Sequence, residues 1–346
     1  MLDVDLEANR PRPADRGFRM PAEWQPHERC WMAWPCRPEL WDDRIHETRK
    51  GFAAIAQAIR RFEPVTMIVH PEDADSAREM LGPSIDLLEM PIDDSWTRDT
   101  GPCFVVNGAG ELAGVDFRFN AWGEKYQPYD QDALMARRML QHLGAERFPS
   151  RLTAEGGGIS VDGEGTLLTT ESCLLNANRN PDWSKQEVEA ELKQLLGIEK
   201  VIWLPGDVEE VETDGHVDGI AVFVRPGVVL IEHSKDATAP WSAALEENIR
   251  ALEGVTDARG RTIELVKIEP AESLESDCER LCRSYVNGYI ANGGVVIPGY
   301  GIPEDARARD VYERLFPDRE VVQVPVNDVA IGGGGIHCIT QQQPAV

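Results

Sequence analysis

Short apolar runs with strand character alternate with single helical segments about five times along this chain, and this alternation restricts the possible folds most strongly. Several runs are paired, as where Pro226 and Gly227 join two of them in a hairpin. The pattern predicts α/β modules arranged around a centre, although no strict sequence repeat establishes a propeller by itself. The strand-like runs are 65–70, 103–107, 112–117, 159–161, 166–170, 201–204, 220–224, 228–232, 263–268, 294–298, 321–324 and 336–340, and the helical segments are 44–60, 130–143, 184–197, 241–252, 272–285 and 303–315.

Composition and charge limit the domain organisation and the partners. Residues 1–19 are rich in Pro, Arg and Asp and are expected to form a flexible arm, whereas no linker divides residues 20–346, which are expected to be one catalytic domain. A net charge of −25 repels a phosphate backbone and favours a small cationic substrate, so nucleic acid is not expected as a partner. No apolar run approaches the roughly 20 residues that span a bilayer, and the acidic N-terminus lacks a secretory signal. We therefore expect no membrane association and a cytoplasmic location.

The seven cysteines are scattered and odd in number, which is typical of reduced thiols in a chain of this kind. Cys278 and Cys282 fall on one face of the predicted helix 272–285, but a zinc site would need two further ligands at suitable spacing, and none stands out. No metal is therefore expected. Four other cysteines are expected to be packed thiols: Cys30, Cys36, Cys103 and Cys173.

Four consecutive glycines at 332–335 come shortly before Cys338 near the end of the chain. Glycine reaches backbone angles closed to other residues and lets a ligand approach the main chain closely. A structural cysteine needs only apolar neighbours and no glycine run, so this stretch favours a catalytic nucleophile. His337 lies on the predicted strand 336–340, where its side chain would point away from that of Cys338, and we expect it to be structural.

Three further stretches carry more polar residues than a core strand needs: 93–102, 155–158 and 212–219. In the third, His216 and Asp218 stand two apart at the start of a strand-like run, so both side chains are expected to face one cleft. An isolated pair of this kind is more often found at a solvated strand edge.

The chemistry becomes specific when these stretches are combined. A thiol together with an imidazole is typical of enzymes that use a nucleophile and a general acid/base. Several carboxylates nearby would hinder an ordinary thiol hydrolase, because negative charge raises the pKa of a cysteine. They suit a cationic guanidinium, whose N–H donors pair with carboxylates in forked fashion and whose charge stabilises a thiolate.

At this point the chain resembles the agmatine deiminases, bacterial-type peptidyl-arginine deiminases of the guanidine-modifying pentein superfamily. The resemblance covers nearly the whole chain from about residue 20. It implies an α/β fold that is a five-bladed pseudo-symmetric propeller of ββαβ-type modules, with no metal, no organic cofactor and a homodimer or larger assembly. The matching stretches are Trp96-x-Arg98-Asp99-x-Gly101-Pro102, Glu155-Gly156-Gly157, residues 169–176 with Arg179-Asn180-Pro181, Gly215-His216-Val217-Asp218, Ser284-Tyr285-Val286-Asn287, and residues 332–342.

The resemblance also implies catalytic roles. Cys338 is then the nucleophile, and His216 is the general acid/base that protonates the leaving ammonia and later activates water. Glu155 orients His216 and lies near the guanidinium. The implied reaction of polyamine metabolism hydrolyses a C–N bond of agmatine through a covalent thiouronium intermediate, giving N-carbamoylputrescine and ammonia.

The remaining implied roles concern substrate binding. Asp99 and Asp218 bind the guanidinium nitrogens by resemblance, and Trp96 packs beside the substrate. Agmatine ends in an ammonium, whereas arginine adds a carboxylate that the acidic segment 209–214 would repel. Glu212 or Asp214 is the candidate anchor for the ammonium, although such acids also suit a solvent-facing turn.

Several alternatives stay open from sequence. Arg98 could meet the carboxylate of an arginine substrate, but we expect it to hold its loop in place. Rival functions are an arginine or peptidyl-arginine deiminase, an amidinotransferase, and a guanidine-binding protein without catalysis. Relatives are expected to carry Ser or Asn where this chain has Gly158, and Asn where it has Gly335. Both differences could alter the pocket.

Overall fold

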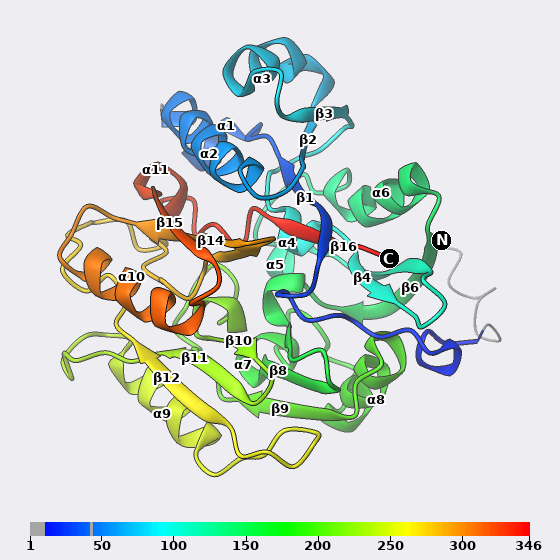
Figure 1. Cartoon of the computed structure of the whole chain (residues 1–346), viewed down its shortest axis with the longest axis vertical. Helices are drawn as coiled ribbons and strands as arrows, with labels where there is room; N and C mark the ends of the chain where they lie inside the picture. The colour runs from blue at the N-terminus through cyan, green and yellow to red at the C-terminus, as the bar shows by residue number, and fades with distance from the viewer. Residues whose placement is uncertain (1–10, 42–43) are drawn as a thin grey trace.

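The computed structural model describes residues 11–41 and 44–346, and these form five small β-sheets arranged around a centre (Figure 1). Four of the sheets have three strands, in which two antiparallel strands are followed by a third that pairs in parallel with the second. These sheets are β4 (Cys103–Val106), β5 (Leu112–Arg118) and β6 (Glu146–Thr153); β7 (Ser160–Val161), β8 (Thr166–Thr170) and β9 (Lys200–Leu204); β10 (Ala221–Arg225), β11 (Val228–Glu232) and β12 (Glu264–Ile268); and β13 (Tyr289–Ala291), β14 (Gly294–Gly299) and β15 (Glu320–Pro325).

One longer helix connects the second and third strands of each sheet, because parallel strands need a crossover connection. These helices lie toward the outside of the molecule in Figure 1, and the strands lie further in. Each unit is thus a ββαβ module, and the predicted α/β propeller of five modules is confirmed. The connecting helices are α2 (Ile45–Arg60), α6 (Met135–Leu143), α8 (Lys185–Leu196), α9 (Ser242–Leu252) and α10 (Glu304–Leu315).

The fifth module combines segments from opposite ends of the chain. Strand β16 (Gln341–Pro344) pairs antiparallel with β1 (His27–Ala33), which pairs in parallel with β2 (Val65–Val69). A fourth strand, β3 (Asp86–Glu89), extends this sheet after α3 (Ala74–Leu81). The circle of modules is therefore closed by strand pairing between residues more than 300 positions apart in sequence.

Local sequence explains several of these elements. Every residue of β2, β8 and β11 is buried, as expected of central strands that are covered by a helix on one side and by the middle of the molecule on the other. Helix α8 begins with a capping box in which Ser184 and Glu187 satisfy each other's backbone amides, and it ends at Gly197 with φ of 66°. Short helices occupy the connections: α1 (Pro38–Trp41), α4 (Thr97–Thr100), α5 (Ala121–Glu124), α7 (Glu171–Leu174) and α11 (Asn327–Ala330).

Two expected elements are absent from the described residues. Residues 272–285 form turns and irregular backbone instead of a helix, because tertiary hydrogen bonds replace helical ones: the Cys282 amide donates to the Ala330 carbonyl, and Arg283 donates to the Ala271 and Leu274 carbonyls. Residues 336–339 form successive turns instead of a strand, and the strand β16 starts only at Gln341.

The expected N-terminal arm lies partly outside the described residues. Its described portion packs on the module of β4, β5 and β6, where Phe18 is buried and Arg19 forms a β-bridge with Val106. The boundary between arm and domain at residue 20 stays a prediction.

Among the residues that the structure describes, no helix is both long and apolar enough to span a bilayer.

Candidate active site

Three short turns and the C-terminal segment before β16 bring the predicted residues together near the centre of the molecule. Asp99 lies on α4, and Glu155 precedes a 3₁₀ turn at Gly156–Gly158. His216 and Asp218 flank Val217 at the start of another 3₁₀ turn, so the expected strand alternation is wrong for this pair. Both nevertheless line one cleft of about 630 Å³ together with Cys338, as the sequence predicted.

Gly157 is the point on which three of these side chains converge. A Cβ atom at this position would lie 2.6 Å from His216 Nδ1, 2.8 Å from Asp99 Oδ1 and 3.0 Å from Asp218 Oδ2. Only glycine leaves these groups room, and its amide donates a hydrogen bond of 2.9 Å to Asp99 Oδ1. One imidazole and two carboxylates thereby share a single buried space.

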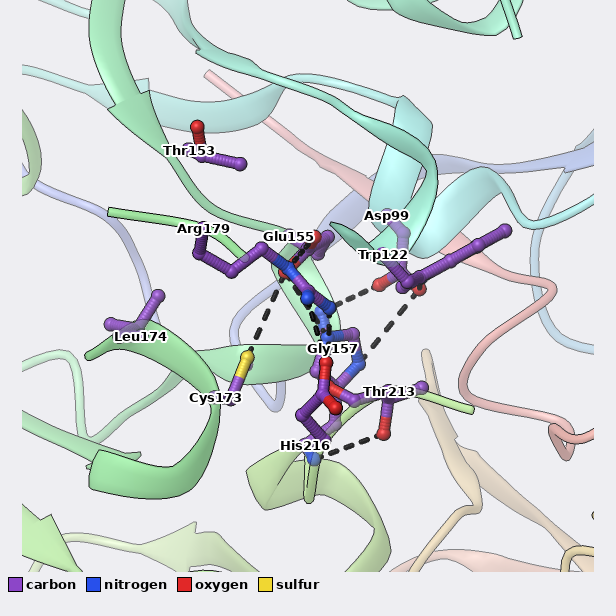
Figure 2. Close-up of polar contacts among 12 residues, drawn as sticks. Asp99, Trp122, Thr153, Glu155, Gly157, Cys173, Leu174, Arg179, Thr213 and His216 are labelled. Carbon is purple, nitrogen blue, oxygen red and sulfur yellow. Dashed lines mark hydrogen bonds and ion pairs between the residues drawn. The ribbon is translucent and has the colours of Figure 1, made fainter. Parts of the chain in front are cut away.

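The imidazole of His216 is held by buried acids on both sides (Figure 2). Its Nε2 lies 3.3 Å from Glu155 Oε2, and its Nδ1 lies 3.8 Å from Asp99 Oδ2. Burial alone would lower the pKa of His216, but the charge of Asp99, the neighbouring Cys173 and the contact with Glu155 raise that pKa well above its ordinary value. The resting imidazole is therefore a cation that can donate a proton.

Glu155 is paired with Arg179, an arginine from one of the matching stretches. Its side chain is fully buried, and its Oε1 accepts a 2.7 Å hydrogen bond from Arg179 Nε. Burial would raise the pKa of Glu155, but the charge of Arg179 and the contacts with His216 together outweigh burial and lower that pKa to about 2. Glu155 is consequently a permanent anion beside His216.

Cys338 lies where the wide cleft meets a narrower space lined by Trp96, Asp99 and Glu212. Its Sγ is 3.2 Å from Asn287 Nδ2 and 3.6 Å from Asp218 Oδ2. Burial first, and the charge of Asp218 next, raise the pKa of Cys338 well above its ordinary value. The Cys338 thiol is therefore protonated until a cationic substrate enters the site.

The expectation that His337 points away from the site is wrong, because the turn at 336–339 reverses its direction. Its Nδ1 lies 2.8 Å from Asp218 Oδ2, and its Nε2 lies 2.8 Å from Glu23 Oε1. Arg98 completes the group: it is buried, its Nε donates to the His337 carbonyl at 3.3 Å, and its Nη1 lies 3.4 Å from Glu23. Arg98 thus holds the loop, as predicted, and His337 links Asp218 to Glu23.

Replacing Glu23 by glutamine is expected to give a pH-dependent loss of stability. Burial raises the pKa of Glu23, but the charges of His337 and then Arg98 outweigh it and lower that pKa to about 2. A depressed carboxylate pKa contributes stability above its unfolded value of about 4.3, and this contribution disappears as the pH falls toward 2. The gap in urea midpoint between wild type and Glu23→Gln should therefore be full near pH 5–6 and shrink on acidification. A gap that grows with acid, or an equal gap for the exposed Glu28→Gln control, would contradict this.

The two candidate anchors for an ammonium differ in their surroundings. Glu212 lines the narrow space and accepts a hydrogen bond from the Tyr126 hydroxyl. Asp214 instead lies 2.7 Å from Arg179 Nη1 and 2.9 Å from Lys125 Nζ, so its charge is already paired with two cations. The geometry therefore favours Glu212 over Asp214 as the anchor.

Trp96 forms one wall of the narrow space, as expected of a residue beside the substrate. Its ring packs against that of Trp41 with the centroids 5.7 Å apart, and it is buried. A Cβ atom at Gly334 would lie 2.4 Å from the Trp96 ring, so the glycine run is needed for the close packing of the Cys338 segment against this wall.

Comparison with known proteins fits this arrangement. The family model for Porphyromonas-type peptidyl-arginine deiminase matches residues 19–344. The chain belongs to this family. The agmatine deiminase of Ectopseudomonas mendocina is 45% identical, covering 96% of this chain and 97% of that protein, and the agmatine deiminase of Stutzerimonas stutzeri is 44% identical with the same coverage. The structure of the agmatine deiminase of Enterococcus faecalis superposes with a TM-score of 0.93 at 37% identity, covering 97% of this chain and 98% of that one.

A more distant structure supports the fold alone. DDAH from Pseudomonas aeruginosa, complexed with citrulline, superposes with a TM-score of 0.52 at 14% identity, covering 92% of this chain and 99% of that one. The pentein architecture is therefore shared well beyond this deiminase family.

Several side chains of this deiminase-family site carried no distinctive sequence signal. Asn287 and Arg179 lie in the matching stretches but were given no role there. Glu23, Trp122 and Tyr126 lie outside the stretches, and Trp122 donates a 2.9 Å hydrogen bond from Nε1 to Asp99 Oδ2. Their roles follow from contacts between residues far apart in sequence, which no local pattern reports.

The two unusual glycines are expected to differ in their tolerance of a side chain. A Cβ atom at Gly335 would lie 2.6 Å from Asn287 Oδ1, which accepts a hydrogen bond from the Cys338 amide, whereas one at Gly158 would lie no closer than 3.8 Å to the Cys173 or His216 side chain. Gly335→Ala should lower kcat by about 10-fold or more, because small displacements of a nucleophile are costly, and Gly158→Ala should stay within about twofold. Steady-state ammonia release checks both, and equal effects would contradict this explanation.

Proposed function

We propose that this protein is an agmatine deiminase, which hydrolyses agmatine to N-carbamoylputrescine and ammonia. The observation that carries the proposal is the convergence of His216, Asp99 and Asp218 on Gly157, with the Cys338 thiol beside Asp218. A thiol with an imidazole acts on electrophilic carbon, and paired buried carboxylates select a planar cation. The relatives named agmatine deiminase support this substrate class.

Substrate binding also activates the nucleophile. Asp99 and Asp218 each accept N–H donors of the guanidinium, which places its central carbon next to Cys338 Sγ. The same two acids raise the pKa of the resting thiol through their negative charge. Since the guanidinium neutralises them, the Cys338 pKa falls when substrate is bound, and the thiol proton leaves through the cleft.

The covalent step then uses His216 as an acid. The thiolate attacks the guanidinium carbon and forms a C–S bond, and the cationic imidazole gives its proton to the departing nitrogen. Cleavage of that C–N bond releases ammonia and leaves a thiouronium on Cys338. Glu155 keeps the imidazolium charged and oriented beforehand.

Hydrolysis of the intermediate uses the same imidazole as a base. Neutral His216 takes a proton from water, whose oxygen attacks the thiouronium carbon. Collapse of the adduct breaks the C–S bond, returns the Cys338 thiolate, and releases the ureido product as the hydroxyl proton of the adduct passes to solvent through the cleft. Asp99 and Asp218 hold the remaining N–H groups throughout both steps.

The far end of agmatine is assigned to Glu212. Its carboxylate borders the narrow space that leads away from Cys338, and its only described side-chain partner there is the Tyr126 hydroxyl. An ammonium is attracted by this carboxylate, whereas the α-carboxylate of arginine is repelled. Asp214, Lys125 and Arg179 form a paired group behind it that keeps the segment in place.

Glu212→Gln is expected to reduce the preference for agmatine. Loss of a charge-assisted contact worth about 1.5–3 kcal/mol corresponds to a fall of about 10- to 100-fold in kcat/KM for agmatine. The agmatine-to-arginine ratio of kcat/KM should fall with it. The matched control Glu246→Gln removes the same charge from an exposed position on α9 and should leave both values unchanged. An unchanged ratio in Glu212→Gln would remove Glu212 as the anchor.

The decisive experiment measures ammonia and ureido product with agmatine, free arginine and a blocked arginyl peptide in parallel. Turnover of agmatine alone supports the proposal. Turnover of arginine or the peptide would keep the thiol chemistry and overturn the substrate. Formation of a transferred amidine product with an added amine, without ureido product, would identify an amidinotransferase instead.

Two further expectations accompany the proposal. A cytoplasmic location is expected from the seven scattered cysteines, an odd number typical of reduced thiols, and cell fractionation tests it. A homodimer follows from the family resemblance, and light scattering of the purified protein tests it.

A further inference from the structure

Cys173 on α7 lies next to Glu155 and His216, and the mechanism above gives it no role. Its side chain is fully buried, and its Sγ is 3.8 Å from Glu155 Oε2 (Figure 2). The same oxygen lies 3.3 Å from His216 Nε2, and these three atoms all lie within 4.8 Å of one another. We propose that Cys173, Glu155 and His216 form an inhibitory site for a thiophilic divalent cation, of which Zn²⁺ is the representative.

The spacing of the three atoms matches a tetrahedral zinc site. Zinc bonds of about 2.3 Å to sulfur and about 2.0–2.1 Å to nitrogen or oxygen place neighbouring ligand atoms about 3.3 Å apart for N and O and about 3.5 Å for S and O. The observed separations are 3.3 Å from His216 to Glu155 and 3.8 Å from Cys173 to Glu155. The third separation, between the Cys173 thiol and His216, is within 4.8 Å, so binding requires these two side chains to approach each other by no more than about 1.3 Å.

The surroundings also suit a metal ion. Arg179 occupies Glu155 Oε1 and leaves Oε2 facing the thiol and the imidazole, so the carboxylate is already oriented by an outer hydrogen bond. A Cβ atom at Gly158 would have Cys173 Sγ and His216 Cδ2 as its nearest neighbours, both at 3.8 Å, and apart from the surrounding turn no other atom of the described residues lies within 4 Å of it. We place a water molecule there as the fourth ligand. His216 lines the wide cleft, which gives the ion its route from solvent.

Metal binding at this site stops catalysis without touching the nucleophile. The ion displaces the proton of the Cys173 thiol and the Nε2 proton of His216, and it takes Glu155 Oε2 from the imidazole. The Nδ1–H that remains on metal-bound His216 is a far weaker acid, because its loss would leave an imidazolate, so His216 no longer alternates between a cationic acid and a neutral base. A chelator removes the ion and frees Cys173 and His216, so the inhibition is reversible.

Cobalt binding distinguishes this site from the obvious rival, in which Cys338 and His216 hold the metal. Co²⁺ is added to wild type, Cys173→Ala, Cys338→Ala and the buried-thiol control Cys103→Ala, and the thiolate-to-cobalt charge-transfer absorption is titrated. The band should appear with one equivalent in wild type, Cys338→Ala and Cys103→Ala, and affinity should fall at least about 10-fold in Cys173→Ala. A band that survives in Cys173→Ala and disappears in Cys338→Ala overturns the proposal, as does no band in wild type.

Zinc inhibition of ammonia release gives the second measurement. The half-inhibiting Zn²⁺ concentration, taken relative to the metal-free activity of each protein, should rise at least about 10-fold in Cys173→Ala but not in Cys103→Ala. Ethylenediaminetetraacetate should restore wild-type activity, and equal inhibition of all three proteins would contradict the proposal. If Cys173→Ala does not fold, the cobalt titration of Cys338→Ala still decides, since that protein retains the proposed site. The cobalt readout needs no turnover, so its outcome is independent of the substrate assigned above.

Discussion

Replacing Cys338 by serine is expected to lower turnover of agmatine by at least about 10³-fold while leaving the substrate able to bind. The serine hydroxyl has a far higher pKa than a thiol, and the neighbouring Asp218 opposes its ionisation further. Asp99 and Asp218 keep their charges for the guanidinium, so binding survives. Ammonia release measures turnover, and titration calorimetry of the variant measures binding.

The matched control is Cys103→Ser, which changes another buried thiol, on β4, outside the cleft. It should keep turnover within a small factor of wild type once folding is verified by circular dichroism. Turnover that survives in Cys338→Ser would remove the nucleophile from the mechanism. Loss of binding together with turnover would show that the thiol also positions substrate.

Arg179→Met is expected to destabilise the protein by about 3–5 kcal/mol, because removing one partner of a buried ion pair leaves an uncompensated charge. Arg179 is fully buried at its side chain and bonds both Glu155 and Asp214 at 2.7 Å. Without Arg179, the pKa of Glu155 rises. A less ionised Glu155 then stabilises the cationic form of His216 less. Urea unfolding should show the stability loss, and kcat should fall with it.

An exposed arginine provides the comparison for this change. Arg259 pairs with Glu199 at 2.7 Å, but the side chains are 48% and 57% exposed, so Arg259→Met should change the free energy of unfolding by no more than about 1 kcal/mol. Similar losses for the two variants would mean that the buried position of Arg179 is not what matters.

The modular fold was predictable where local signals are strong. Helix α8 has both a capping box and a terminal glycine, and its bounds follow from sequence almost residue by residue. The buried strands β8 and β11 coincide with their expected ranges because apolar runs between turn residues are distinctive. Strand β6 was missed, since its charged and polar residues alternate with the apolar ones too irregularly to signal a strand.

The wrongly predicted helix at 272–285 is explained by tertiary contacts. In 272–285 the spacing of Leu274, Cys278 and Cys282 imitates one face of a helix, yet the backbone there bonds to distant groups instead of to itself. Single-sequence periodicity cannot register such partners, because it reports only what neighbouring residues share.

The candidate site likewise contains residues that the sequence could identify and residues that it could not. Cys338, His216 and the nearby carboxylates could be found because their chemistry is unusual for a core. Asn287, Glu23 and the true orientation of His337 could not, since each depends on a contact across the molecule: Asn287 with Cys338, and Glu23 with His337. A single assumed strand at 336–340 was enough to point His337 the wrong way.

The pairing of β16 with β1, which completes the fifth module, has a consequence for biosynthesis. A nascent chain already contains His216, Asp99 and Asp218 long before Cys338 is made, and Cys338 stands only three residues before the strand that pairs with β1. The reactive thiol is thus supplied at nearly the same moment as the last strand that completes the ring of modules. Translation order therefore keeps partly made chains chemically inert toward guanidines, because no nucleophile exists until the architecture around it can form.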